Sequence, residues 1–330
     1  MQPPYLLFLG DVADQLAAKT AHGILEWRRD WCLGQLRLAG CKADLGLPEM
    51  TPAEAAAAGA RTLVVAVANS GGVLAERWQP AILEALAAGL DVASGLHQRL
   101  SDFPTIVEAA ARFHRRLFDV RHPRQRFATG TGARRPGKRL LTVGTDCSCG
   151  KKYTALALER EMRRRGWNAD FRATGQTGIM IAGDGVAIDA VVADFISGAV
   201  EWLAPANDPG HWDVIEGQGS LFHPAFAGVS LGLLHGAQAD VLVLCHEPTR
   251  RHVRGLPHQK LPALADCIEL NLRCAALTNP DVRLVALSIN TAWLPKEDRL
   301  RYLERTAAEF KLPAVDPLLT GVAAIVDRLR

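Results

Sequence analysis

The sequence predicts an α/β protein of two domains, each built on a parallel β-sheet. The chain has 330 residues, a length that corresponds to about two domains of ordinary size. In both halves, short apolar runs with the length of buried strands alternate with helical patterns, as in parallel sheets joined by crossover helices. Residues 121–138 are basic and rich in glycine and proline, which predicts a linker between domains at 1–120 and 139–330.

The first domain is expected to begin with a strand over Tyr5–Leu9, a purely apolar run. Apolar spacing then predicts helices over Ala13–Trp31, the alanine run 55–58, Pro80–Ala88 and Ile106–Val120, and strands over Thr62–Ala68 and Leu90–Ala93. Gly89 stands where a left-handed residue commonly ends a helix. No GxGxxG pattern follows the first strand, so we do not expect NAD to bind there.

The second domain is expected to repeat this alternation. Strands are expected over Arg139–Val143, Asp170–Ala173, Asp213–Glu216, Asp240–Cys245 and Arg283–Ile289, and helices over Lys151–Arg165, Gly185–Leu203, Pro262–Leu277 and Lys296–Lys311. Open α/β sheets bind ligands at the carboxyl ends of their strands, and pockets often form between domains. We therefore expect the ligand in a cleft between the two domains.

Composition excludes several classes of protein. Apolar residues make up 48% of the chain and charged residues 22%, which is ordinary for a globular enzyme. The net charge of +3 is too small for a nucleic-acid binder, and no apolar run approaches the roughly 18 residues of a membrane helix. The N-terminus lacks the basic start of a signal peptide, and the seven cysteines have no framework spacing. We therefore expect a cytoplasmic protein with reduced thiols.

The strongest functional signal is the segment LLTVGTDCSCGKKYTALAL, in which a strand leads through a glycine-bearing loop to a lysine that opens a helix. This order is typical of phosphate-binding loops, where backbone N–H groups and the helix N-terminus face phosphate oxygens. The candidate phosphate or coenzyme ligands are Gly144, Thr145, Asp146, Cys147, Ser148, Cys149, Gly150, Lys151, Lys152 and Thr154. Five residues separate the two glycines, one more than in the GxxxxGK pattern. A plain strand-to-helix turn is the alternative.

The residue after Lys151 favours a loop that holds phosphates without a metal ion. A Walker-type loop carries Ser or Thr at this position to bind Mg²⁺, whereas this chain has Lys152. Thr154 comes two residues later, roughly 200° further round an ideal helix, although a helical bulge would restore it. We therefore expect no bound metal. In the alternative, Glu216, Asp146 and Thr154 hold Mg²⁺ beside ATP.

A carboxylate ends the predicted strand in the segment WDVIEGQGSLFHP. This residue is Glu216, and the glycines at 217 and 219 let the backbone come close to a ligand. A carboxylate in this position either holds a magnesium ion or takes a proton from a reacting group. We expect Glu216 to be the catalytic base, with His223 as the second candidate.

Three further segments are candidates for substrate binding. The segment ATGQTG follows a strand and contributes Thr174, Gly175, Gln176 and Thr177. The segment HEPTRRHVRGLPHQK also follows a strand and contributes basic residues, of which Arg251 and Arg254 are the candidates for binding substrate carboxylates. His97 follows a first-domain strand. The alternatives are a tight turn before a helix for ATGQTG and a solvated charged loop for the basic segment.

Cys147 and Cys149 leave a further alternative open. No second close cysteine pair completes a zinc site. A thiol near a helix N-terminus generally has a lowered pKa, so an acetyl-cysteine intermediate stays an alternative to direct transfer.

Two resemblances emerge from these motifs. GTDxxxGK and EGQG resemble the motifs of dethiobiotin synthetase-like P-loop enzymes. Over nearly the whole chain, AKTAHGIL, ASGLHQRLSD, VGTDCSCGKKYTALAL, ATGQTGIMIAGDGVAIDAVVADFISGAVEW and IEGQGSLFHPAFAGVSLGLLHGAQAD resemble one two-domain family of long-unknown function. This resemblance implies a Rossmann-like N-terminal domain followed by a P-loop NTPase-like α/β domain. Some members of the family are D-glutamate N-acetyltransferases that work alongside an enolase-superfamily N-acetylglutamate racemase.

The resemblance implies an N-acetyltransferase that moves acetyl from acetyl-CoA to the amine of an acidic amino acid, D-glutamate, in D-amino-acid catabolism. The phosphate loop then holds the phosphates of acetyl-CoA, and the chain acts on a small molecule as a homo-oligomer, without nucleic acid or membrane. Two alternatives stay open. One is an ATP- and Mg²⁺-dependent ligase or kinase of the dethiobiotin synthetase-like class, and the other is a nucleotide-dependent switch or chaperone.

Overall fold

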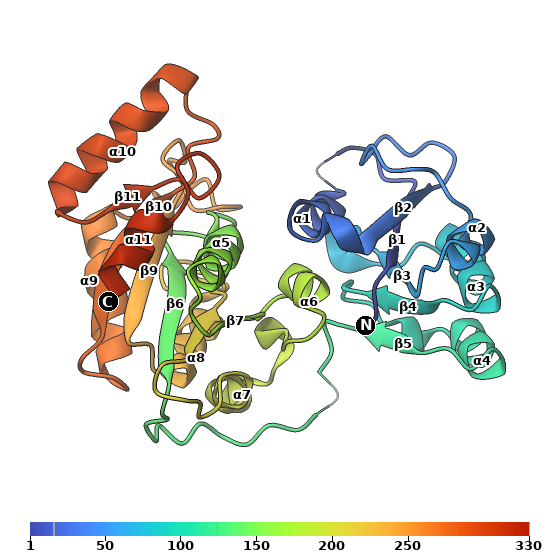
Figure 1. The fold of residues 1–330 in the computed structure, drawn as a ribbon, viewed down its shortest axis with the longest axis horizontal. Coiled ribbons are helices and arrows are strands. Elements are labelled where there is room, and N and C mark those ends of the chain that lie inside the picture. The colour runs from blue at the N-terminus through green and yellow to red at the C-terminus, as the bar shows by residue number, and fades with distance from the viewer. Residues whose placement is uncertain (16, 124, 330) are drawn as a thin grey trace. The chain divides into compact units, whose positions relative to one another are not determined.

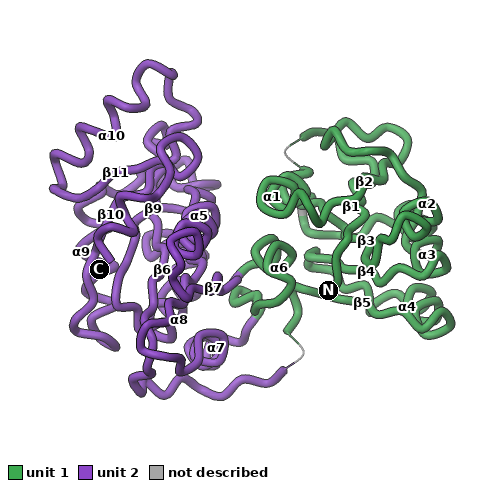
Figure 2. The backbone as a smooth tube through the Cα atoms, in the orientation of Figure 1, with its two compact units in different colours: residues 1–124, 175–190 green, residues 125–174, 191–330 purple. Residues whose placement is uncertain are grey.

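The computed structural model describes residues 1–15, 17–123 and 125–329, and the chain divides into two compact units (Figures 1 and 2). Unit 1 comprises Met1–Arg124 and Gly175–Ala190, and unit 2 comprises Gln125–Thr174 and Val191–Arg330. The bounds expected from the sequence place 175–190 in the second domain. In the structure this segment packs with the first 124 residues instead, so the chain passes between the units three times.

Unit 1 is built on a five-stranded parallel sheet with the order β2-β1-β3-β4-β5. Its strands are β1 (Tyr5–Gly10), β2 (Cys32–Arg37), β3 (Thr62–Val65), β4 (Asp91–Ser94) and β5 (Leu117–Asp119). Its helices are α1 (Lys19–Trp27), α2 (Pro52–Ala57), α3 (Gln79–Ala87), α4 (Pro104–Arg112) and α6 (Gln176–Ala182). Every residue of β1 is buried, as expected for a strand covered on both faces.

Two expectations for unit 1 were wrong in part. The helix expected over Ala13–Trp31 is shorter, because a turn in which Asp14 accepts a hydrogen bond from Ala17 precedes it, and position 16 lies outside the described residues. The helix expected over Ile106–Val120 ends at Arg112, and His114 with φ +53° turns the chain into β5. Hydrogen bonding to β4 makes β5 a strand despite its helical spacing, and pairing with β1 does the same for β2, which periodicity did not reveal.

Unit 2 is built on a six-stranded parallel sheet with the order β11-β10-β9-β6-β8-β7. Its strands are β6 (Lys138–Gly144), β7 (Ala169–Arg172), β8 (Trp212–Ile215), β9 (Val241–His246), β10 (Arg283–Ile289) and β11 (Ala314–Val315). Its helices are α5 (Lys151–Arg164), α7 (Ile196–Leu203), α8 (Ala227–Ala237), α9 (Leu264–Ala276), α10 (Lys296–Phe310) and α11 (Ala323–Val326). The five strands expected in this half are confirmed.

The helix expected over Gly185–Leu203 was wrong in its first half. Gly183 with φ +84° ends α6, and Gly185 with φ +147° follows it, so 3-10 turns replace the helix until Ile196. Helix α8 was not expected, because its small and apolar residues surround the helix instead of forming one stripe.

The central position of β6 brings the site loops together. Strand β6 pairs with β8 on one side and with β9 on the other, so the loops after all three strands emerge at one edge of the sheet. Such a point, where neighbouring connections run in opposite directions, is where open α/β sheets bind ligands.

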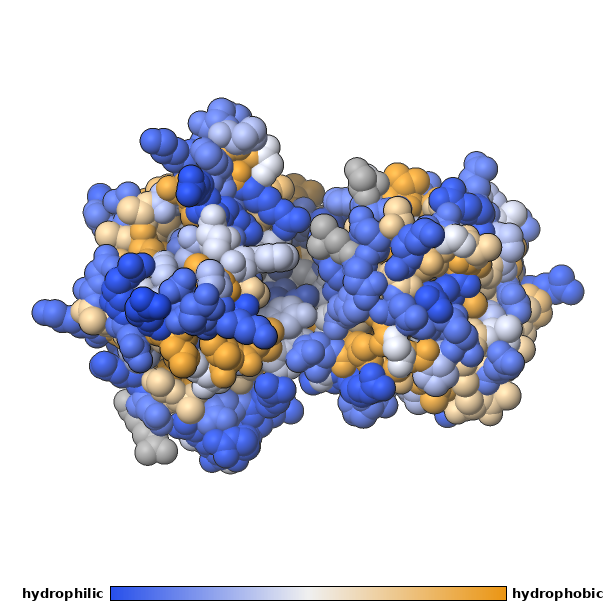
Figure 3. Space-filling model, turned by 90° about the horizontal axis from the view of Figure 1, so that it is seen from above, coloured by the Kyte–Doolittle hydropathy of each residue, from blue (hydrophilic) through white to orange (hydrophobic). Residues whose placement is uncertain are grey.

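Polar residues cover most of the face shown in Figure 3, with apolar side chains in separate patches. Over the described residues, none of the helices combines the length and the apolar character needed to cross a membrane.

Candidate functional site

The loop between β6 and α5 has the conformation of an anion-binding loop. Gly150 precedes α5 with φ +113°, and Ser148 also has a positive φ, +52°. The N-cap residue of α5 is Gly150, which has no side chain to cap the helix, and the first N–H groups of a helix point toward the segment before it. These groups and the helix dipole supply fixed positive potential.

Lys151 lies across this loop. Its ammonium donates a hydrogen bond to the carbonyl oxygen of Asp146 at 2.7 Å and lies 3.7 Å from the sulfur of Cys149, and the side chain is buried. The nitrogen of Lys152 lies 5.3 Å from the ring centre of Tyr153. The ammonium of Lys151 is thus held at the loop by its contact with Asp146.

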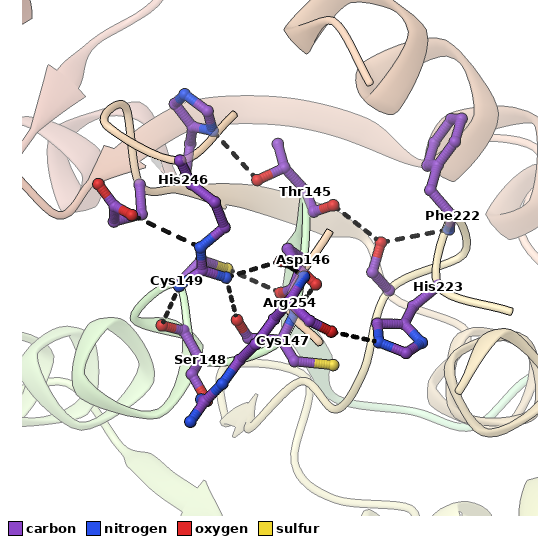
Figure 4. A network of polar contacts seen from close by, with 12 residues as sticks. Thr145, Asp146, Cys147, Ser148, Cys149, Phe222, His223, His246 and Arg254 are labelled. Carbon is purple, nitrogen blue, oxygen red and sulfur yellow. Dashed lines mark hydrogen bonds and ion pairs between the residues drawn. The ribbon is translucent and has the colours of Figure 1, made fainter. Parts of the chain in front are cut away.

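Two arginines from the segment after β9 contact the same loop, and Figure 4 shows one of them, Arg254. Arg250 Nη1 donates to Asp146 Oδ2 at 2.7 Å and to the carbonyl oxygen of Cys147 at 2.6 Å. The backbone N–H of Arg254 donates to the same Oδ2 at 2.8 Å, and its guanidinium donates to the hydroxyl of Ser148. The loop thus carries three cationic side chains next to one buried carboxylate, a composition suited to phosphate.

The two arginines expected to bind substrate carboxylates lie in different surroundings. Arg254 contacts the phosphate loop. Arg251 is exposed, and its carbonyl oxygen accepts a hydrogen bond from the backbone N–H of Leu261. Arg250 was not chosen as a site residue in the sequence. The segment is made of turns around one isolated bridge residue, His252, so no strand-like alternation in the sequence distinguishes Arg250 from Arg251.

His223 lies against the loop but has both ring nitrogens engaged. Nδ1 accepts a hydrogen bond from the backbone N–H of Ala225 at 3.2 Å, so the proton resides on Nε2, which donates to the carbonyl oxygen of Arg254 at 3.2 Å. In this conformation neither nitrogen is available to take a proton from a substrate. The geometry therefore favours Glu216 over His223 as the base.

Glu216 is buried directly after β8 and is held by the loop after β7. Its Oε2 accepts a hydrogen bond from the backbone N–H of Thr174 at 3.0 Å. The next residue, Gly217, lies so close to β6 that an added Cβ would overlap the carbonyl oxygen of Thr142 and lie 3.0 Å from Cδ of Lys151. The absence of a side chain at 217 thus brings Glu216 beside the phosphate loop.

Two of the residues expected for the magnesium alternative, Thr154 and Asp146, are engaged in hydrogen bonds. Thr154 is fully buried, and its hydroxyl bonds to the carbonyl oxygen of Gly150 at 3.0 Å and to Ser288 at 2.7 Å. Asp146 instead lies with Cys147 and His223, whose potential metal-binding atoms fall within 4.8 Å of one another among the described residues. Both oxygens of Asp146 already accept hydrogen bonds from N–H donors, which leaves this group poorly suited to a cation.

The acetyl-cysteine alternative gains no support from the electrostatics. Burial raises the pKa of the Cys147 thiol, and this effect outweighs the opposite influence of Lys151. The neutral thiol is a poor nucleophile.

The remaining substrate candidates lie in unit 1. Gln176 Oε1 accepts a hydrogen bond from Arg121 at 3.0 Å, and the hydroxyl of Thr177 lies 3.4 Å from that of Thr20. Gly175 precedes α6 as its N-cap residue. His97 follows β4, and burial lowers its pKa, with a further contribution from Arg121. The structure therefore places Thr174 and Glu216 in unit 2 and these candidates in unit 1.

His246, at the end of β9, is a site residue that sequence reasoning missed. Its Nδ1 lies 3.1 Å from the hydroxyl of Thr145, and burial lowers its pKa to about 4. The register Gly144↔Cys245 makes the next residues, Thr145 and His246, neighbours, and no pattern in the sequence reveals this register.

Comparison with known proteins agrees with this architecture. A family model described as a P-loop domain of unknown function, DUF1611_C, matches residues 126–326, and a Rossmann-like one, DUF1611_N, matches residues 36–123. A crystal structure of a DUF1611 family protein from Anabaena variabilis has a TM-score of 0.87 and 30% identity, with 99% of each chain covered. The expected Rossmann-like and P-loop domains are thereby confirmed.

Two curated proteins are similar over their full length. Each is named D-glutamate N-acetyltransferase, one from Pseudoalteromonas sp and one from Tritonibacter scottomollicae. Each is 52% identical over 329 residues, which covers 100% of this chain and 99% of the relative.

Proposed function

The chain belongs to the DUF1611 family and is an acyltransferase, and from this premise we propose that it transfers the acetyl group of acetyl-CoA to the amine of D-glutamate. The acceptor is supported by the name of the two relatives at 52% identity. The donor is supported by one observation above all. Lys151, Arg250 and Arg254 converge on a loop at the N-terminus of α5.

The phosphates of acetyl-CoA fit this loop better than a phosphate that is to be cleaved. The pyrophosphate would take the backbone N–H groups at the start of α5 and the ammonium of Lys151, in place of the loop oxygen that this ammonium now contacts. Lys152 stands at the position of the metal-binding hydroxyl, and the hydroxyl of Thr154 is buried against β10. In acetyl transfer no phosphoryl group moves, so the proposed reaction does not need that hydroxyl.

Glu216 is the proposed base. The ammonium of D-glutamate must lose a proton before its nitrogen attacks the thioester carbonyl carbon. The carboxylate of Glu216 takes this proton, the nitrogen forms the new C–N bond, and the C–S bond breaks. The nitrogen then loses a second proton and the leaving thiolate gains one, so the products are N-acetyl-D-glutamate, free coenzyme A and one proton, which Glu216 releases to solvent.

Partners and location are part of the same proposal. We propose that the protein works in the cytoplasm as a homo-oligomer, without nucleic acid. A racemase of the enolase superfamily that acts on N-acetylglutamate would consume its product. His97, Gln176 and Thr177 of unit 1 are proposed as groups that bind carboxylates, and burial lowers the pKa of His97.

A thiol-release assay tests the proposal. Purified protein is mixed with acetyl-CoA and D-glutamate, and free thiol is measured; L-glutamate and D-glutamate without acetyl-CoA are the controls. We expect thiol release that depends on D-glutamate. Turnover that needs ATP and Mg²⁺ and does not use acetyl-CoA would replace the proposal with the ligase alternative.

A further inference from the structure

Three apolar side chains are exposed together at the edge of the unit 2 sheet that carries the phosphate loop. Trp293 follows β10 and is 75% exposed, and Leu318 and Leu319 follow β11 and are 62% and 48% exposed. Single apolar residues at a surface are ordinary, but three from two neighbouring loops call for an explanation. We refer to these three residues as the apolar platform.

The loops that carry the platform are held in place. The buried carboxylate of Asp316 accepts hydrogen bonds from the backbone N–H and the hydroxyl of Thr291 through Oδ2, at 2.9 and 2.6 Å. Its Oδ1 accepts from the backbone N–H groups of Leu318 and Leu319, at 3.0 and 3.3 Å. One carboxylate thus ties the Trp293 loop to the leucine loop.

Arg299 of α10 fixes the same loop from the other side. Its guanidinium donates to the carbonyl oxygens of Ala292 and Leu294, at 2.8 and 3.2 Å, on either side of Trp293. The backbone that presents the indole is therefore already ordered, so a ligand that stacks on it would not have to order the loop.

The platform continues from the phosphate loop. The hydroxyl of Thr145 contacts His246, whose carbonyl oxygen accepts a hydrogen bond from the backbone N–H of Asn290 at 2.8 Å. A Cβ placed on Gly150 would lie 4.0 Å from the Cβ of Asn290. Trp293 is three residues further along the chain, at most about 10 Å away along the backbone.

We infer that the apolar platform is the stacking surface for the adenine ring of the acyl-donor coenzyme, an inference that rests on the proposed function. In coenzyme A the adenine is separated from the pyrophosphate by one ribose, which matches an aromatic side chain placed next to a phosphate loop. Stacking on an aromatic ring needs no specific hydrogen bonds, so an exposed indole is sufficient.

A second copy of the chain fits the platform less well. Stable protein interfaces bury roughly 800 Å² on each partner. The charged side chains of Lys296, Glu297 and Asp298 begin α10 directly after the Trp293 loop, and of the large apolar side chains described on α10 Leu300 alone is exposed, so the apolar area is limited to a few side chains. That area suits one planar ring.

Steady-state kinetics with two acyl donors test the inference. Acetyl-CoA carries the nucleotide, whereas acetylpantetheine has the same thioester without it. We expect Trp293→Ala to raise the KM for acetyl-CoA roughly 5- to 100-fold, the range of base stacking on an aromatic ring, and Trp293→Phe to retain most of the affinity. With acetylpantetheine, Trp293→Ala and wild type should have the same kcat/KM.

Trp202 offers a matched control, because it is 52% exposed and lies on α7, away from α10 within unit 2 in Figure 1. Trp202→Ala should leave KM and kcat/KM unchanged with both donors. The inference is overturned if wild type uses acetyl-CoA and Trp293→Ala has the same KM, including the case in which the variant only dissociates an oligomer. The inference is also overturned if Trp293→Ala lowers kcat/KM by the same factor with acetyl-CoA and with acetylpantetheine. A wild-type enzyme that does not use acetyl-CoA at all would instead refute the proposed function.

Discussion

Glu216 and Thr174 bind each other twice: the backbone N–H of Thr174 donates to Oε2 of Glu216 at 3.0 Å, and the hydroxyl of Thr174 donates to the carbonyl oxygen of Glu216 at 2.6 Å. This pair joins the end of β8 to the end of β7. The two hydrogen bonds hold Glu216 in a buried position at the ligand edge of the sheet. A general base has to be positioned in this way before it takes a proton from a reacting group.

Replacement of Glu216 by Gln should therefore reduce kcat while coenzyme binding is retained. Glu216→Gln keeps the side-chain shape but removes the charge. We expect kcat to fall by roughly 10² to 10⁴, the usual contribution of a positioned acid or base. Glu269→Gln, which removes a carboxylate that is 69% exposed on α9, is the control and should keep normal turnover. Near-normal kcat of Glu216→Gln from pH 6 to 9 would assign the proton transfer to another group.

Lys151 should be needed for coenzyme affinity. Loss of its ammonium removes a cation from the loop, so we expect Lys151→Ala to weaken coenzyme A binding about tenfold or more in calorimetry, because a charge-assisted hydrogen bond contributes about 1.5–3 kcal/mol. Lys138→Ala, at the opposite end of β6, serves as the matched control. Equal affinities of the two variants would show that the loop does not bind the phosphates.

Replacement of two adjacent arginines, Arg250 and Arg251, should have different effects on coenzyme A binding and on the melting temperature. Arg250 contacts the phosphate loop and Arg251 is exposed, although they are neighbours in sequence. Arg250→Ala should weaken coenzyme A binding and lower the melting temperature, because the buried carboxylate of Asp146 loses a charged partner. Arg251→Ala should change neither. The opposite order in thermal-shift titrations would restore the original sequence-based choice of Arg251.

Acetyl transfer should not require a divalent metal. Lys152 replaces the usual metal-binding hydroxyl residue, and the hydroxyl of Thr154 is engaged with Ser288. We expect thiol release from acetyl-CoA and D-glutamate to persist in excess EDTA. Complete loss of activity that Mg²⁺ restores would favour the metal-dependent alternative.

Stability should decline on acidification because of His246. Burial lowers its pKa to about 4 from an ordinary value near 6.5, so the folded state holds fewer protons than the unfolded state between these pH values. The contribution of His246 to the free energy of unfolding is therefore fully present above pH 6.5. It is lost as the pH falls toward 4, by at most about 3 kcal/mol. His246→Asn should flatten the decline in melting temperature across this window. Parallel profiles of variant and wild type would contradict this assignment.

The sequence by itself determined the parts of the site that are continuous along the chain. The strand, the glycine-bearing loop and the helix from Arg139 to Arg165 depend on local periodicity and on glycine conformation, both of which are written in neighbouring residues. The same holds for Glu216, whose place directly after a buried strand puts it at the ligand edge of a parallel sheet.

Tertiary structure decided what no local pattern could. Strands β2 and β5 exist because β1 and β4 supply hydrogen-bonding partners, and the segment 175–190 belongs to unit 1 because of its packing there. The choice of Arg250 over Arg251, and the engagement of both nitrogens of His223, depend on groups far away in sequence. Hydrogen bonds between distant segments depend on the relative position of whole strands, and that position is set by the burial of the core and not by any single stretch of sequence.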